Sequence, residues 1–271
     1  MKKKIVIILL LISSICFAHE WDEDSFNNKK NFQEGVIRAI GVSAPGQEEY
    51  KALTAAQIIA QTNLIAKIKG ASISSRKIRR NGVIIQDEIY RTIHGLIVGA
   101  EPCGEKYYQD KGYAKYCVQI SLNGRKGVYD AVFPAIKDYL PKGEFFKSDT
   151  TFNSKMAENY DGLIIDVKNF SSFQPAIANR ILNEYWRVIY EPSMVFQKIL
   201  IEKGPVQFAT SNGKAKAILS NIGSKNPLYV KAKKINNHTD IVVCDDDADK
   251  IYKSNSKSNM LNNARVVFIL N

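Results

Sequence analysis

Histidine is scarce in this chain, and it is a side chain on which many metal sites and acid–base catalysts depend. The 271 residues contain three, His19, His94 and His238, and no two of them stand at the spacing of metal ligands. The Gly-x-Ser-x-Gly elbow, the phosphate-binding P-loop and the dinucleotide glycine fingerprint do not occur either. We therefore expect no enzyme activity, no cofactor and no metal site.

Long hydrophobic runs are also missing after residue 18, where no apolar stretch approaches the ~20 residues of a membrane-spanning helix. The one marked run, residues 5–15, follows three lysines and leads into residues 16–18, which end in Ala18. A basic start, a short apolar stretch and small residues at the end are typical of a removable secretory signal. We expect cleavage after Ala18, a periplasmic location and at most peripheral contact with the membrane.

Cys16 leaves one alternative open, because a cysteine at the end of a signal can be the lipid-anchored first residue of a lipoprotein. Lipoprotein processing favours a small residue directly before that cysteine and leucine three positions before it. This chain has Ile15 and Ser13 at those two positions. Cleavage after Ala18 is therefore the expected route, and lipid anchoring at Cys16 is the alternative.

Acidic residues are outnumbered, since 38 Lys and Arg face 27 Asp and Glu in the whole chain. Loss of the signal would remove three lysines and no acid, which leaves 35 basic residues and a formal charge of +8. Such a surplus favours anionic lipids or envelope polymers, and export argues against nucleic acid as a partner. The basic residues are scattered, however, which is more typical of a solvated surface. The main groups are Lys67, Lys69, Arg76, Lys77, Arg79 and Arg80, and then Lys231, Lys233 and Lys234.

Three cysteines follow the signal, and two of them are placed to form a disulfide. Cys103 and Cys117 are equidistant from residue 110, which lies in a turn between two β-rich runs. We expect a Cys103–Cys117 bridge that closes a loop of about fifteen residues and contributes on the order of 3 kcal/mol. A metal site is the alternative reading, and it lacks a second Cys/His pair at ligand spacing. Cys244 follows an apolar run, and we expect it to be a buried structural thiol.

Hydrophobic periodicity divides the chain into two small α+β domains, each expected to pair a mostly antiparallel sheet with one or more helices. A flexible mature N-terminus (19–34) precedes the first domain (35–140), and a linker (141–159) separates it from the second (160–271). The first should contain strands at 35–44, 71–80, 83–91, 92–108 and 113–122, a hairpin turn at Asn81-Gly82, and helices at 47–69 and 127–139. The second should contain strands at 162–167, 178–182, 187–190, 206–209, 228–235, 241–244 and 264–270, and helices at 195–202, 214–221 and 246–253.

Two acidic groups could be read as sites. Asp245, Asp246, Asp247 and Asp249 lack the glycine turn of a cation-binding loop, and consecutive acids after a strand favour the N-terminus of a helix instead. Asp161, Asp166 and Glu184 could be imagined as paired carboxylates, but nothing in the sequence brings them together.

His19 would become the first residue after cleavage, and an N-terminal histidine can chelate copper. That geometry needs a second histidine and an ordered terminus, whereas residues 19–33 are polar and rich in Asn and Asp. A copper or hydrolytic enzyme therefore depends on His19 alone.

Several segments resemble a known family. These are Gly35-Val-Ile-Arg-Ala-Ile-Gly-Val, the helix with Ala52, Ala55, Ala56 and Ala60, and the run Gly95-Leu-Ile-Val-Gly-Ala. They resemble the N-terminal domain of the flagellar ring protein FlgT and the related small-lipoprotein (LPP-type) family. Further segments, at 160–166, 175–176, 180–182, 226–228 and 264–267, resemble the C-terminal half of uncharacterised secreted relatives.

The resemblance covers most of residues 35–270 and implies an α+β periplasmic module without catalytic residues. Such modules build or brace envelope structures, in the case of FlgT the outer-membrane-associated ring of a flagellar motor. The middle and C-terminal domains of FlgT are not recognisable in this chain. We therefore expect a non-enzymatic structural protein of the cell envelope with envelope or flagellar partners, its oligomeric state open. The alternative is a periplasmic binding module for an anionic ligand or surface.

Overall fold

The computed structural model describes residues 27–72, 91–137, 143–148 and 159–271, and the structural statements below refer to these residues. The expected signal, residues 19–26 and the expected turn at Asn81-Gly82 lie outside the described residues. The helices and strands, in chain order, are α1 (Asn28–Glu34), β1 (Val36–Val42), α2 (Glu49–Ser72), β2 (Glu101–Tyr108), β3 (Tyr113–Ser121), α4 (Val128–Ile136), β4 (Gly162–Asp166), β5 (Ile181–Leu182), β6 (Val188–Tyr190), α5 (Gln197–Lys203), β7 (Gln207–Ala209), α6 (Asn212–Asn221), β8 (Pro227–Lys231), β9 (Lys234–Asn236), β10 (Asp240–Val242), α7 (Asp245–Ser258) and β11 (Val266–Ile269).

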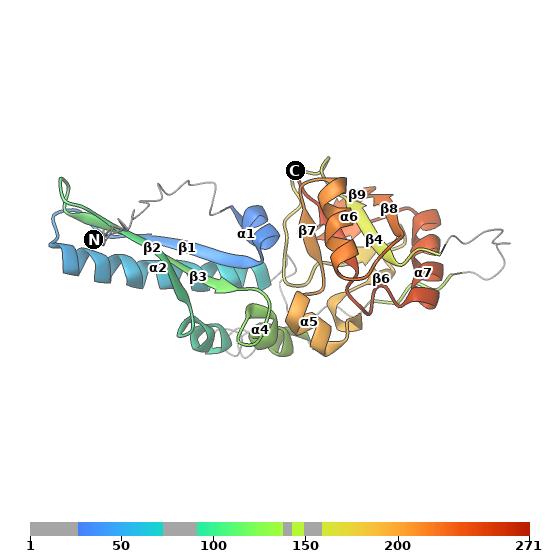
Figure 1. The fold of residues 1–271 in the computed structure, drawn as a ribbon, viewed down its shortest axis with the longest axis horizontal. Helices are drawn as coiled ribbons and strands as arrows, with labels where there is room; N and C mark the ends of the chain where they lie inside the picture. The colour runs from blue at the N-terminus through green and yellow to red at the C-terminus, as the bar shows by residue number, and fades with distance from the viewer. Residues whose placement is uncertain (1–26, 73–90, 138–142, 149–158) are drawn as a thin grey trace, which may run out of the picture.

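The first unit is a three-stranded antiparallel sheet, in the order β1-β3-β2, with the long helix α2 on one face (Figure 1). Burial alternates along β1 because every second side chain points towards α2. The facing stripe of α2 consists of residues four positions apart: Ala52, Ala56, Ala60, Leu64 and Ile68. The helix lies so close to the sheet that a Cβ at Gly41 would overlap the backbone of Ala56, so only glycine fits there.

Side chains of α2 also cover the free edge of β1. The side-chain amide of Asn63 donates to the carbonyl oxygen of Ile40 at 2.7 Å, and Nζ of Lys67 donates to that of Arg38 at 2.9 Å. Burial lowers the pKa of Lys67. Two backbone acceptors on this edge of the sheet are thus hydrogen-bonded within the fold.

The expected disulfide is present and joins the two strands of the β2–β3 hairpin. Cys103 and Cys117 have Cα atoms 5.0 Å apart. The strand register shifts between Pro102 and Gly104, so that Gly104 stands directly opposite Cys117 and Cys103 occupies a bulge. The bridge therefore ties the bulge to the central strand of the sheet.

The second unit is built on a parallel sheet, in the order β7-β11-β4-β8. Helix α6 covers one face, where Ala215 and Leu219 pack on Ile164, Val267 and Ile269. The opposite face belongs to the main core of the molecule. Because both faces are covered, β11 is buried along its whole length.

A second, mixed sheet in the order β6-β5-β10-β9 packs beside it, and β5 runs parallel to β10. Arg180 and Asp240 form a buried bidentate ion pair at the start of these two strands, with a shortest distance of 2.6 Å. The side chain of the neighbouring Asn179 accepts from the backbone N–H of Ala176 and donates to the carbonyl of Thr239. These polar contacts connect two segments about sixty residues apart.

The α+β class expected from the sequence is confirmed, and most elements of the second unit lie where they were predicted. The expectation of a mostly antiparallel sheet holds for the first unit and is wrong for the parallel sheet of the second. Its strands are short apolar runs separated by helices, and such connections return each strand in the same direction. The predicted strand 228–235 is divided into β8 and β9, which belong to different sheets.

Three further expectations are corrected. Residues 28–34 of the expected flexible segment form α1, because Asn27 caps the helix and Phe32 is buried. Residues 91–97, expected in a strand, are helical, and Ile93, Leu96 and Ile97 are buried at helical spacing. Within the expected linker, the backbone N–H of Phe146 donates to Val188, so residues 144–146 pair with β6.

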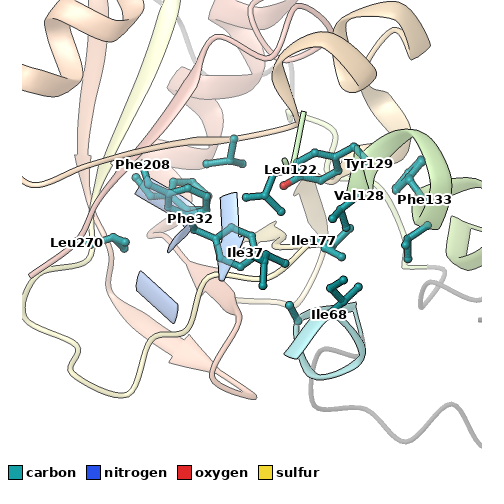
Figure 2. Packing of buried hydrophobic residues seen from close by; sticks show 14 of the residues in the cluster. Phe32, Ile37, Ile68, Leu122, Val128, Tyr129, Phe133, Ile177, Phe208 and Leu270 are labelled. Atoms are coloured by element: carbon teal, nitrogen blue, oxygen red, sulfur yellow. The ribbon is translucent and has the colours of Figure 1, made fainter. Parts of the chain in front are cut away.

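The two units share one hydrophobic core, which runs through the junction between them (Figure 2). The ring of Phe32, on α1, meets the ring of Phe208, on β7, edge to face with centroids 5.6 Å apart. Backbone hydrogen bonds also cross the junction, from the N–H of Gly124 to the carbonyl of Ile201 at 2.7 Å and from that of Ile177 to Ala71 at 3.0 Å. The first and second units are therefore packed as one body.

Replacement of Phe32 by alanine tests this packing. Phe32 is 3% exposed, so Phe32→Ala leaves a cavity at the junction, and we expect the free energy of unfolding to fall by about 3–5 kcal/mol. The parent protein should unfold in one cooperative transition, whereas the unfolding of the variant should separate into two transitions, one for each unit. Chemical denaturation followed by circular dichroism measures both effects. Phe196→Ala, at a position that is 55% exposed, is the control and should change little; an equal loss in both variants contradicts a shared core.

Candidate functional site

A groove of about 650 Å³ lies where α1 of the first unit meets β7 and α6 of the second. Its floor is apolar and its rim is polar. The floor is formed by Phe208, Ala209, Ala217 and Ile218, and the rim by Asn27, Lys29, Lys30, Gln33, Glu34, Thr210, Lys214, Asn221 and Asn271. The groove adjoins the carboxyl ends of β7 and β11, the edge at which ligands bind to open parallel sheets.

The charge of the groove is positive. Lys29, Lys30 and Lys214 line it, and Glu34 is the only acidic side chain in its lining. Glu34 forms an ion pair with Arg38, which lies outside the groove, so this acid is already neutralised. Nζ of Lys29 donates to the side-chain oxygen of Asn271 at 2.5 Å, which holds that ammonium group at the rim. The arrangement favours a ligand that carries negative charge.

The beginning of α6 contributes to the same rim. The side chain of Ser211 caps the helix by accepting from the backbone N–H of Lys214 at 3.2 Å. The positive end of the helix dipole therefore adds to the charge of Lys214. The residues that line the groove include no histidine and no cysteine.

A second surface feature lies at the β5–β6 turn, where Tyr185 and Trp186 are displayed to solvent. Tyr185 is 72% exposed, and Trp186 has φ +67°, a left-handed conformation in which glycine or asparagine is usual. The turn is held by the side chain of Asn183, which accepts from the backbone N–H groups of Tyr185 and Arg187. Nζ of Lys234 lies 5.1 Å from the ring centroid of Trp186. We call Tyr185, Trp186 and Arg187 the aromatic patch.

The structure does not bring the three candidate carboxylates together. Asp161 directly precedes β4 and Asp166 is its last residue, at the opposite end of the strand. Glu184 lies in the β5–β6 turn, where it pairs with Lys233 at 2.5 Å. Asp166 accepts from the hydroxyl of Tyr229 at 2.6 Å, and this hydrogen bond raises the pKa of Tyr229 to about 12. Each carboxylate thus has its own local partners.

The acidic cluster occupies the first turns of α7, as the sequence predicted. Asp245 accepts from the side chain of Asn183 at 3.0 Å, and Asp247 and Asp249 pair with lysines one turn further along the helix. Within the part of the chain that the structure describes, no cluster of three or more His, Cys, Asp or Glu side chains could hold a metal ion. In the same residues, no helix is long and apolar enough to cross a bilayer.

The remaining candidate residues are dispersed. His19 lies outside the described residues, His94 lies on the helix at 91–97, and His238 lies in a turn next to the carbonyl of Ser172. Cys244 is a free thiol, partly exposed at the N-cap of α7, and burial raises its pKa, so little reactive thiolate forms.

The lysines of the groove were missed in the sequence, because they belong to segments about 180 residues apart. A local signal did exist in the second segment. Thr210-Ser211-Asn212-Gly213 follows a short apolar strand and leads into a helix, which is the usual place of a ligand-binding turn in a parallel sheet. No comparable signal marks Lys29 and Lys30.

Asp161 gives a test of the second unit that depends on pH. Burial alone would raise its pKa, but hydrogen bonds from the backbone N–H groups of Lys225 and Asn226 and from the hydroxyl of Ser224 outweigh burial and hold the pKa below its usual value. A lowered pKa in the folded state stabilises the protein above the unfolded-state value near 4, and this stability is lost as the pH falls further.

We therefore expect Asp161→Ala to lower the melting temperature at pH 7, with a difference from the parent protein that shrinks below about pH 4. Thermal unfolding between pH 7 and pH 3 measures it. Asp110→Ala, in the exposed turn between β2 and β3, is the matched control. A difference that is constant over this pH range contradicts the role of the Asp161 carboxylate.

Comparison with known proteins finds a match in one part of the chain. The family model for the second domain of Treponema pallidum Tp0624 matches residues 162–271. No protein among the curated sequences matches the chain. The family match begins at the first residue of β4 and takes in both sheets of the second unit, which is therefore similar to the second domain of Tp0624.

Proposed function

We propose that this chain is a non-enzymatic structural protein of the cell envelope, which assembles with or braces an envelope structure in the periplasm. The observation that carries the proposal is the hydrophobic core shared by the two units. A protein that only displays two independent binding modules gains nothing from such a junction, whereas a brace needs to transmit force without bending at a hinge. The sequence resemblance of residues 35–140 to FlgT N-terminal domains supports the proposal and makes a flagellar ring one candidate assembly.

The aromatic patch is the surface proposed for contact with a protein partner. Tryptophan, tyrosine and arginine are the residues that most often dominate binding energy at interfaces, and all three occur next to each other here. The left-handed backbone of Trp186 costs about 1–2 kcal/mol relative to glycine, a cost that is retained at sites where the side chain has a function. The patch lies on the second unit. A rigid junction would transmit the force from a partner bound at the patch to the first unit.

Site-specific crosslinking in intact cells tests this proposal. A photo-crosslinking amino acid at Tyr185 should give adducts with one or a few envelope proteins, because the patch faces the partner. The same amino acid at Tyr50, which is 81% exposed on α2, is the matched control and should give fewer adducts. Recovery of the uncrosslinked chain alone from both positions, or identical adducts from both, contradicts the proposal.

The basic groove favours a second candidate function, the binding of an anionic ligand. Three lysines surround an apolar floor, and the one acidic side chain in the lining is neutralised by Arg38. This combination suits a ligand with a phosphate or carboxylate group and an apolar part. The ligand would contact both units and so would also stabilise their junction.

Charge reversal on α6 tests the groove. Lys214→Glu removes one attraction and adds one repulsion, so we expect the dissociation constant for fluorescent polyphosphate to rise about fivefold or more at low salt. Lys216→Glu, two residues away on the same helix and outside the groove, makes the same change in net charge and should have a smaller effect. Equal effects of the two variants indicate that only net charge matters and exclude a site in the groove.

A further inference from the structure

The β1-β3-β2 sheet has one face turned away from α2, and its residues can be assigned from the strand register. Val42 stands opposite Lys115, and Lys115 stands opposite Lys106, so these three side chains form one row across the sheet. Tyr113 and Tyr108 stand opposite each other in the next row, towards the turn. The side chain of Val42 is about half exposed, so this part of the sheet is open to solvent.

The two lysines converge on one aromatic ring. Nζ of Lys106 lies 4.9 Å from the ring centroid of Tyr108, and Nζ of Lys115 lies 5.9 Å from the same centroid. The ring of Tyr108 is itself fixed by stacking on Tyr113, with centroids 4.5 Å apart and planes 4° apart. The disulfide between Cys103 and Cys117 holds the same two strands together. The two ammonium groups are therefore presented by a preorganised hairpin.

Like charges directly opposite each other on neighbouring strands destabilise a sheet. Among the described residues, neither Lys106 nor Lys115 forms an ion pair with a carboxylate. The adjacent Glu105 stands on the opposite face of the strand, because side chains alternate. An anion bound between the two ammonium groups would remove the repulsion.

We propose that Lys106 and Lys115 bind the phosphate group of an anionic lipid and so dock the tip of the first unit on a membrane surface. The position favours a lipid over a soluble anion, since the β2–β3 turn lies at the end of the molecule remote from the second unit (Figure 1). The composition favours it as well. Lysine and tyrosine are residues that the interface of a bilayer accommodates, with the ammonium groups at the phosphates and the rings at the headgroup level.

Lys106→Glu gives the sharpest test, because it should have opposite effects on stability and on binding. It replaces the Lys106–Lys115 repulsion by an attraction, so the melting temperature should hold or rise. Binding to vesicles of phosphatidylglycerol and phosphatidylethanolamine, measured by cosedimentation at low salt, should weaken about tenfold or more. Lys106→Arg keeps the charge and should retain binding.

Control variants and a soluble probe separate this site from general electrostatics. Lys216→Glu, on α6 and outside the groove, changes net charge equally and should leave most vesicle binding intact. Equal losses in Lys106→Glu and Lys216→Glu overturn the proposal, and so does a lower melting temperature for Lys106→Glu. Binding of inorganic polyphosphate is measured with the same variants. If polyphosphate binds through Lys106 at phosphate concentrations at which vesicles do not bind, the site belongs to a soluble anion and the membrane contact is overturned.

Discussion

The contact of Phe32 with Phe208 is the constraint on which the arrangement of the molecule depends. Phe32 belongs to a helix of seven residues, too short to be stable by itself, and its burial against the second unit is what fixes α1 in place. With α1 fixed, Lys29 and Lys30 reach the rim of the groove opposite α6. The same contact thus joins the two units and completes the basic groove between them.

The second unit was the more predictable part of the fold. Its strands are short apolar runs between turn residues, and β4, β7, β10 and β11 fall within or close to the ranges expected from the sequence. The direction of the strands was not predictable from the same runs, because a short apolar run is compatible with a buried strand in a parallel or in an antiparallel sheet. The helix at 91–97 was missed although Ile93, Leu96 and Ile97 have helical spacing, since β-branched residues there suggested a strand.

The candidate site was predictable only in its parts. The disulfide could be inferred because its cysteines lie on one hairpin, and the acidic turn of α7 could be inferred because capping is local. The groove is formed between residues 27–34 and residues 208–221, and no sequence pattern within either segment indicates that it lies next to the other. The pairing of Lys106 with Lys115 was likewise not predictable, because equal spacing about residue 110 would place Lys106 opposite Ala114. The turn between Tyr108 and Tyr113 instead places it opposite Lys115, and the bulge at Cys103 shifts the register only beyond that point.

The covered edge of β1 has a consequence for how this sheet meets other chains. An open strand edge invites a foreign strand to add to it, which is a common beginning of aggregation. On β1, such a strand would first have to break the hydrogen bonds that the side chains of Asn63 and Lys67 make to the backbone, and to displace these two side chains from the edge. A crowded compartment with many partly folded chains would therefore leave this side of the protein unaltered.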